Sequence, residues 1–181
     1  MNINVESVKT TQSEIGAWQA REFRSGGESP NWYSDALIIA EETGEVCRCF
    51  VKRQQDIRGG SDHWCNELRK ELGDVAITVL AFGANWGVDV TANIDQFKEI
   101  YSDDFTSADV CLLLVGAVGA LTRSLFETTD PSVTAIDLSE ILMLTAHVST
   151  LEGMNWDDVL SERWTEVQQR RFAKQASVDG V

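Results

Sequence analysis

Two short acidic clusters lie inside otherwise apolar, helix-length segments, and this feature constrains the fold more than any other. The first, Glu41-Glu42-Thr43-Gly44-Glu45, follows the apolar residues 36–40. The second, Glu71-Leu72-Gly73-Asp74, precedes the apolar residues 75–80. A carboxylate beside a core-forming face is costly unless another group compensates its charge. The two clusters therefore predict a shared charged site between packed helices.

The spacing within each cluster places its carboxylates on one side of a helix. Glu42 and Glu45 are three positions apart, as are Glu71 and Asp74, so each pair projects from a single helical face. If the two helices pack antiparallel, these four carboxylates meet and repel one another unless a cation lies between them. Hard divalent ions with oxygen ligands, Mg²⁺ or Mn²⁺, suit such a cluster.

Glu41 belongs to the same motif but points elsewhere. It precedes Glu42 by one position, which turns its side chain about 100° away from the proposed ligand face. We expect it to support the ligands or to help activate water. The general base is expected among the carboxylates of this cluster, and the spacing favours no single one of them.

The remaining pattern is helical throughout. One apolar stripe recurs at steps of four, three, four and three: Leu68, Leu72, Val75, Val79 and Phe82. In the first half we expect helices over about 11–23, 31–54, 62–86 and 89–101, with residues 1–10 as a loose lead-in. Thr11-Gln12-Ser13-Glu14 has the pattern of a capping box. No segment shows the alternation of a strand, so the predicted fold class is an all-α helical bundle.

The second half aligns with the first as a degenerate copy. Residues 36–48 align without gaps with 111–123, residues 71–75 with 137–141, and residues 87–89 with 153–155. These matches predict two repeats, over 12–101 and 107–175, with the second packed on the first. Chance similarity between apolar helices is the alternative.

The second repeat lacks most of the acidic residues. Gly116, Ala117 and Ala120 stand where the first half has its three glutamates, and only Asp137 and Glu140 remain. A single carboxylate pair cannot build the same four-ligand site. We therefore expect one metal site per chain, in the first half.

Composition excludes several classes of protein. With 43% hydrophobic residues and two prolines among 181 residues, a disordered chain is not expected. A formal net charge of −14 argues against binding to nucleic acid or anionic membranes, so a polyanionic substrate would have to arrive with metal. The apolar run 110–118 is too short to span a bilayer.

The cysteines and the N-terminus point to the cytoplasm. Cys47, Cys49, Cys65 and Cys111 show no paired CxxC spacing and are expected to be small, buried, reduced residues. The start of the chain lacks the cationic region and apolar core of a signal peptide. We therefore expect a soluble cytoplasmic protein.

The acidic motifs, in their surroundings, resemble those of the MazG-like, all-α nucleoside triphosphate pyrophosphohydrolases. Glu-Glu-x-x-Glu is followed, after residues 46–70, by Glu-x-x-Asp. Trp18 and Phe23 precede the motif, and Lys52 and Ile57-Arg58-Gly59-Gly60 lie between its parts. The resemblance extends over residues 12 to 100, and the segment from Gly153 to Phe172 is similar to the closing helix of such domains.

The resemblance implies cleavage of a nucleoside triphosphate between its α and β phosphates, giving a monophosphate and pyrophosphate. Glu42, Glu45, Glu71 and Asp74 would hold Mg²⁺, which neutralises phosphate charge and lowers the pKa of a bound water. The resemblance also implies substrate contacts. Phosphate would be bound by Lys52 and Arg58, and less favourably by Lys70 and Lys98, while Trp18 and Phe23 would stack on a base. For each of these residues the alternative is an ordinary surface charge or core packing.

Other functions stay open on the sequence. A dUTPase-like enzyme of the same superfamily is a close variant, and phosphoribosyl-ATP pyrophosphohydrolase is a looser match. A non-catalytic helical module that binds nucleotide or a protein partner is a different class. His63 and His147 lack the Glu-x-x-His spacing of a di-iron bundle. Whether two chains pair as a homodimer is also open.

Overall fold

The computed structural model describes residues 3–22, 31–55, 60–101, 104–128 and 130–178, with the backbone alone for 60–62 and 170–178. Its elements, in chain order, are α1 (Val5–Glu22), α2 (Trp32–Gln54), α3 (Gly60–Trp86), α4 (Ile94–Ile100), α5 (Ser107–Glu127), α6 (Pro131–Leu151) and α7 (Trp156–Val178). No strand occurs among these residues. The predicted all-α fold class is therefore confirmed.

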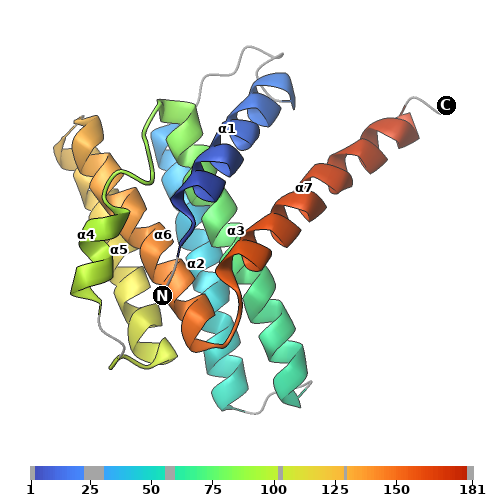
Figure 1. Ribbon diagram of the computed structural model, residues 1–181. Coiled ribbons are helices and arrows are strands. Elements are labelled where there is room, and N and C mark those ends of the chain that lie inside the picture. The colour runs from blue at the N-terminus through green and yellow to red at the C-terminus, as the bar shows by residue number, and fades with distance from the viewer. Residues whose placement is uncertain (1–2, 23–30, 56–59, 102–103, 129, 179–181) are drawn as a thin grey trace.

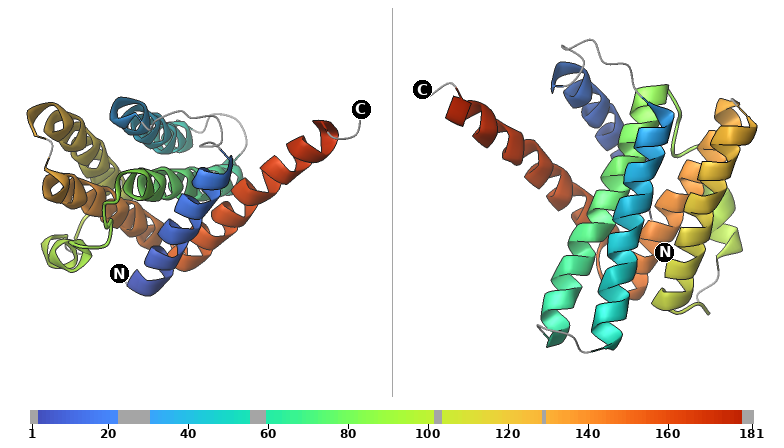
Figure 2. Two further views of the ribbon diagram at one scale, coloured as in Figure 1. Left: turned by 90° about the horizontal axis from the view of Figure 1, so that it is seen from above. Right: turned by 180° about the vertical axis from the view of Figure 1, so that it is seen from behind.

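Two helical hairpins form the body of the molecule. Helices α2 and α3 run antiparallel and pack along their length, as do α5 and α6, and the two hairpins lie side by side (Figures 1 and 2). Helix α3 is central, since it packs against α1, α2, α6 and α7. Helix α6 buries every residue from Ile141 to Ser149. The apolar stripe predicted on α3 lies in this core, with Leu72 and Val75 fully buried.

The closing helices exchange between the hairpins. Helix α4, which follows α3 in the chain, packs on α6, whereas α7, which follows α6, packs mainly on α3. Figure 1 shows α7 lying across α3 and then projecting away from the body. Trp164 of α7 also contacts α1, where its indole nitrogen donates to Glu14 at 2.9 Å. The second acidic cluster, on α3, is thus contacted by a helix from the far end of the chain.

The helix boundaries agree with the prediction in the middle of the chain and differ at two places. The expected loose lead-in is wrong, because α1 begins at Val5, and both Val8 and the preceding Ile3 are buried. Thr11 therefore lies inside a helix, where its hydroxyl donates to the Ser7 carbonyl instead of capping. The expected helix from residue 89 begins later, at Ile94, because Asp89 holds Thr91 in a turn.

The two hairpins end in matching turns, 66 positions apart (153 − 87). Gly87 and Gly153 both have positive φ, 68° and 73°. The next amide in each case reaches back five residues, from Val88 to Gly83 at 2.8 Å and from Met154 to Ser149 at 2.9 Å. This is the left-handed C-terminal cap that glycine favours. The correspondence lies where the sequence aligns 87–89 with 153–155.

Helix α5 is longer and more apolar than the run 110–118 suggested. Its 21 residues have the length and composition that would cross a membrane, a property that core helices of soluble proteins share. One side of α5 packs on α2 and α6, and a third of the residues in its most apolar 18-residue stretch are buried. At the α2–α5 contact, the Cys47 and Cys111 sulfurs are 3.4 Å apart as free thiols.

Candidate metal centre

Three of the predicted carboxylates come together between α2 and α3. Glu42 projects from α2, and Glu71 and Asp74 from α3; one oxygen from each lies within 4.8 Å of the others. The three-residue spacing on α3 and the antiparallel hairpin produce this arrangement, as the sequence indicates. This is the one group of three or more potential metal ligands in the part of the chain that the structure describes.

Glu71 is the most enclosed of the three. The residue is only 5% exposed, and the Nζ of the neighbouring Lys70 lies 3.5 Å from its carboxylate. Burying a carboxylate costs free energy unless a cation or several hydrogen bonds compensate for its lost hydration. At 3.5 Å, Lys70 provides a weak contact.

Glu42 experiences the repulsion of the cluster directly. Burial, together with the charges of Asp74, Glu71 and Glu41, raises the pKa of its carboxyl from 4.5 to about 7. The Arg163 guanidinium opposes this shift. A group shifted in this way marks the point where the cluster most needs a positive charge.

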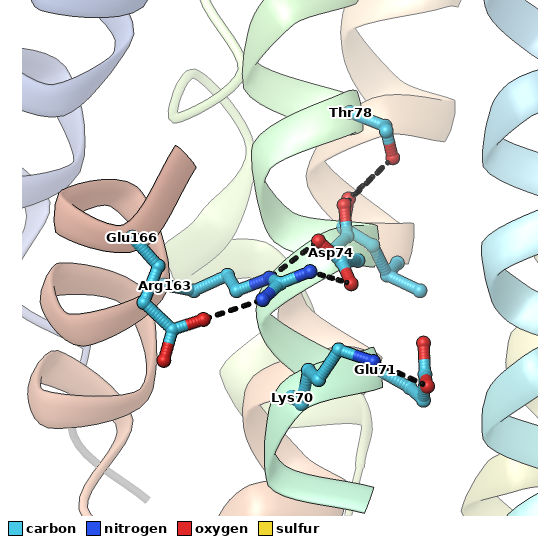
Figure 3. A network of polar contacts seen from close by, with 7 residues as sticks. Lys70, Glu71, Asp74, Thr78, Arg163 and Glu166 are labelled. Atoms are coloured by element: carbon cyan, nitrogen blue, oxygen red, sulfur yellow. Dashed lines mark hydrogen bonds and ion pairs between the residues drawn. The ribbon is translucent and has the colours of Figure 1, made fainter. Parts of the chain in front are cut away.

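Asp74 is held by an arginine that the sequence did not place here. The Nε and Nη2 atoms of Arg163, on α7, each donate to one Asp74 oxygen at 2.6 Å (Figure 3). The third donor, Nη1, reaches Glu166 one turn along α7 at 2.5 Å. The Arg163 side chain is 6% exposed. A buried, bidentate pair of this kind fixes both partners in place.

Gly73 makes this approach of α7 possible. A Cβ atom at that position would lie 2.6 Å from Cβ and 2.8 Å from Cγ of Arg163. The absence of a side chain therefore lets the arginine stem pass against the α3 backbone. Gly44, in the first acidic motif, has nothing within 4 Å of the corresponding point, so packing does not account for it.

The other two predicted carboxylates lie outside the group. Glu45 pairs with Arg48 on the same helix, one turn further on. Glu41 is exposed. The structure thus brings three of the four predicted ligands together, and the fourth forms a local ion pair.

The predicted substrate contacts are spread over the molecule. Lys52 lies over the Trp64 ring at 5.2 Å, Lys70 faces Glu71, and Lys98 pairs with Asp95 on α4. Trp18 packs edge-on against Trp164, with ring centroids 5.7 Å apart. Phe23 and Arg58 lie outside the described residues. Of these side chains, Lys70 is the one that contacts the carboxylate group.

In the second half, the two carboxylates that align with Glu71 and Asp74 have neutral hydrogen-bond partners. Asp137 is buried and accepts a hydrogen bond from the Ser124 hydroxyl, while Glu140 accepts one from the Tyr101 hydroxyl. Burial raises the pKa of Asp137. Among the residues that the structure describes, no third carboxylate joins these two as Glu42 joins Glu71 and Asp74.

The carboxylates fit a divalent cation in their chemistry, since oxygen donors from three side chains suit Mg²⁺ or Mn²⁺. Asp74 fits least well in the described arrangement, because both of its oxygens accept from Arg163. Comparison of the chain with protein-family models, curated proteins and solved structures finds no match.

Proposed function

We propose that the chain is a Mg²⁺-dependent nucleoside triphosphate pyrophosphohydrolase that cleaves ribo- or deoxyribonucleotides to monophosphate and pyrophosphate. The observation that carries the proposal is the convergence of Glu42, Glu71 and Asp74 in a partly buried hairpin. The resemblance of the acidic motifs to the MazG-like enzymes supplies the reaction. Clearing surplus or non-standard nucleotides is a role that such an activity would serve.

The residues have distinct roles in this proposal. Glu42 and Glu71 would hold the metal ion, with Asp74 available when its arginine partner moves. The ion, when bound, would neutralise phosphate charge and lower the pKa of a water molecule. Lys70 lies beside the group, within reach of a phosphate oxygen approaching Glu71. Glu41, exposed next to Glu42, would accept a proton from that water.

We also infer that α5–α6 is a degenerate copy of α2–α3, which leaves one site per chain. The turns after α3 and α6 support this, since they match in backbone geometry and hydrogen bonding. The residues two positions after the turn glycines match too. The side chains of Asp89 and Asn155 each accept a hydrogen bond from the backbone amide two residues further on, at 2.9 Å. If the two halves are copies, α4 and α7 are their corresponding closing helices. Each of them packs on the hairpin of the other half, α4 on α6 and α7 mainly on α3.

A second candidate function is a helical module without catalysis. The bidentate contact of Arg163 with Asp74 favours it, because an internal cation already balances part of the acidic charge. A dUTPase-like preference is a variant of the enzymatic proposal and is separated from it by substrate choice alone.

Release of pyrophosphate tests the enzymatic proposal. The protein is incubated with Mg²⁺ and a panel of ribo- and deoxyribonucleoside triphosphates, including dUTP, and pyrophosphate is measured. We expect turnover that requires Mg²⁺ or Mn²⁺. Glu42→Gln and Glu71→Gln should each reduce it by about 100-fold or more, because loss of a direct ligand costs at least as much as loss of its supporting contacts.

Asp137→Asn is the matched control, since it neutralises a buried carboxylate in the second half and can still accept from Ser124. It should leave turnover within about twofold of the parent, because Ala117 stands where the first half has Glu42 and the second half lacks the three-carboxylate group. No turnover of any nucleotide would favour the module. Equal losses from Asp137→Asn and Glu42→Gln would contradict a single site in the first half.

A further inference from the structure

Arg163 places a permanent positive charge inside the acidic group. Its guanidinium engages both Asp74 oxygens, and its side chain is almost entirely buried. We propose that Arg163 is an internal cation that competes with the divalent metal for Asp74, so that metal enters when the guanidinium moves outward to Glu166. This inference rests on the proposed function, because it concerns the same metal site.

The competition follows from the geometry at Asp74. A Mg²⁺ or Mn²⁺ ion would need an oxygen of this carboxylate at about 2.1 Å. Each Asp74 oxygen already has a guanidinium nitrogen at 2.6 Å. A divalent ion on the same oxygen would lie close to a cation in a poorly hydrated site, where like charges repel strongly. Full ligation by Asp74 and the present Arg163 contact therefore exclude each other.

Arg163 has a second acceptor that lies towards solvent. Glu166 is on the same face of α7, three positions further on, and receives Nη1 at 2.5 Å. The Glu166 side chain is 55% exposed, compared with 16% for Asp74. The guanidinium can leave Asp74 and keep a carboxylate partner, which makes its departure far less costly than exposure of an unpaired buried ion.

The arginine stem is held against α3, so the inferred movement concerns the guanidinium alone. Gly73 allows the Cβ and Cγ atoms of Arg163 to lie against α3. The adjacent Trp164 is held through Glu14 and Trp18 of α1. These contacts keep α7 in place, so the movement we infer is a rotation of the side chain and does not require α7 to detach.

The second half supports the link between the arginine and the acidic charge. Glu140, which aligns with Asp74, is bonded by the neutral Tyr101 hydroxyl from the segment after α4. A closing segment thus contacts this position in both halves, yet it carries a cation only where three carboxylates converge. The charge of Arg163 is therefore matched to the cluster and is not a general requirement of the packing.

Mn²⁺ binding to the full-length protein tests this inference without measuring activity. Free Mn²⁺ is followed by its electron paramagnetic resonance signal during titration. Arg163→Met keeps the apolar stem and removes the charge, so we expect roughly 5- to 100-fold tighter binding, the usual range for coupled sites. Glu166→Gln should weaken binding several-fold, because the displaced guanidinium loses its charged outer partner.

Arg53→Met is the matched control, because Arg53 makes a comparable two-bonded pair with Glu152 outside the acidic group. Its Mn²⁺ affinity should stay that of the parent. Thermal unfolding shows that each variant folds, and added Mn²⁺ should raise the melting temperature of Arg163→Met more than that of the parent.

The outcomes separate this inference from the proposed function. If the parent binds Mn²⁺ and Arg163→Met binds it no better, Arg163 is a structural partner of Asp74 and the inference is wrong. Unchanged binding by Glu166→Gln would overturn the outward movement even if Arg163→Met did not fold. If neither the parent nor any variant binds Mn²⁺, the metal site itself is absent and the proposed function falls with it.

Discussion

Glu42 lies where α2 approaches α3, with Glu71 and Asp74 opposite it. Its environment favours the protonated carboxyl, and its pKa rises from 4.5 to about 7. In the unfolded chain the same side chain ionises near its ordinary pKa. Below about pH 4.5 the group is protonated in both states, so it does not change the free energy of unfolding with pH. Between the two values only the unfolded chain releases the proton, so stability falls as the pH rises.

This difference predicts a pH-dependent effect of Glu42→Gln on the metal-free protein. The glutamine cannot ionise, so the variant should gain stability relative to the parent as the pH rises from about 4.5 to 7. The gain should level off at higher pH, where Glu42 is charged in both states. Urea unfolding in the presence of a chelator, repeated across this range, measures it. Parallel stability curves for parent and variant would show that Glu42 is not under this repulsion.

At the residue scale, the sequence predicted contacts that depend on spacing within one helix, and it did not predict contacts between residues far apart in the chain. The side-chain face of Glu71 and Asp74 depends on helix geometry alone, so the sequence could place them together. Arg163 bonds a residue 89 positions away, and no local pattern encodes that distance. Glu45 instead pairs three positions on, with Arg48, which the helical spacing of opposite charges could have indicated.

Gly73 shows how one residue fixes the contact between two helices. It lies on α3 at the crossing of α7, where a methyl group would overlap the Arg163 stem. The atoms that would clash are Cβ and Cγ of Arg163, and the Cβ cannot move without the α7 backbone. The crossing therefore depends on the absence of a side chain at this position.

Gly73→Ala should destabilise the protein by about 1–3 kcal/mol through this overpacking. Gly44→Ala is the matched change, because Gly44 is also inside a helix but is exposed with nothing within 4 Å of the added carbon. It should stabilise the protein by about 0.5–1 kcal/mol, since alanine is the better helix former. Chemical denaturation followed by circular dichroism compares the two. Similar effects of both substitutions would mean that α7 does not cross α3 at Gly73.

At the element scale, the sequence predicted the long central helices and missed the ends of the shorter ones. The helices predicted over 31–54 and 62–86 have boundaries within two residues of α2 and α3 in the structure. The start of α1 depends on burial of Ile3 and Val8 against the rest of the bundle, which a capping pattern at Thr11 cannot reveal. Helix α4 is short because Asp89 stabilises a turn before it.

The exchange of closing helices makes the two halves depend on each other. Helix α3 gains much of its cover from α6 and α7, and α6 is covered in part by α4. Periodicity within each half predicts helices with apolar faces, but it does not say which half covers which face. The sequence therefore indicated that the halves pack together and could not indicate the exchange.

We expect a fragment of residues 1–101 to fail to fold alone as a monomer. Without the second half, the faces of α3 that contact α6 and α7 would be exposed, together with the face of α2 that contacts α5. Circular dichroism should show a loss of cooperative thermal unfolding, and co-expression with residues 104–181 should restore it. Size-exclusion chromatography identifies any self-association of the fragment. A folded monomer of residues 1–101 would contradict this dependence.

The thiol contact between α2 and α5 has a consequence for how the chain behaves in different surroundings. Cys47 and Cys111 are 64 positions apart in the chain and adjacent in space. Hydrogen bonding from Cys111 lowers the pKa of Cys47 to about 7, which favours a reactive thiolate near neutral pH. In an oxidising medium the two sulfurs would bond and close a covalent ring through both halves, so that the hairpins would stay tethered even after the helices had melted.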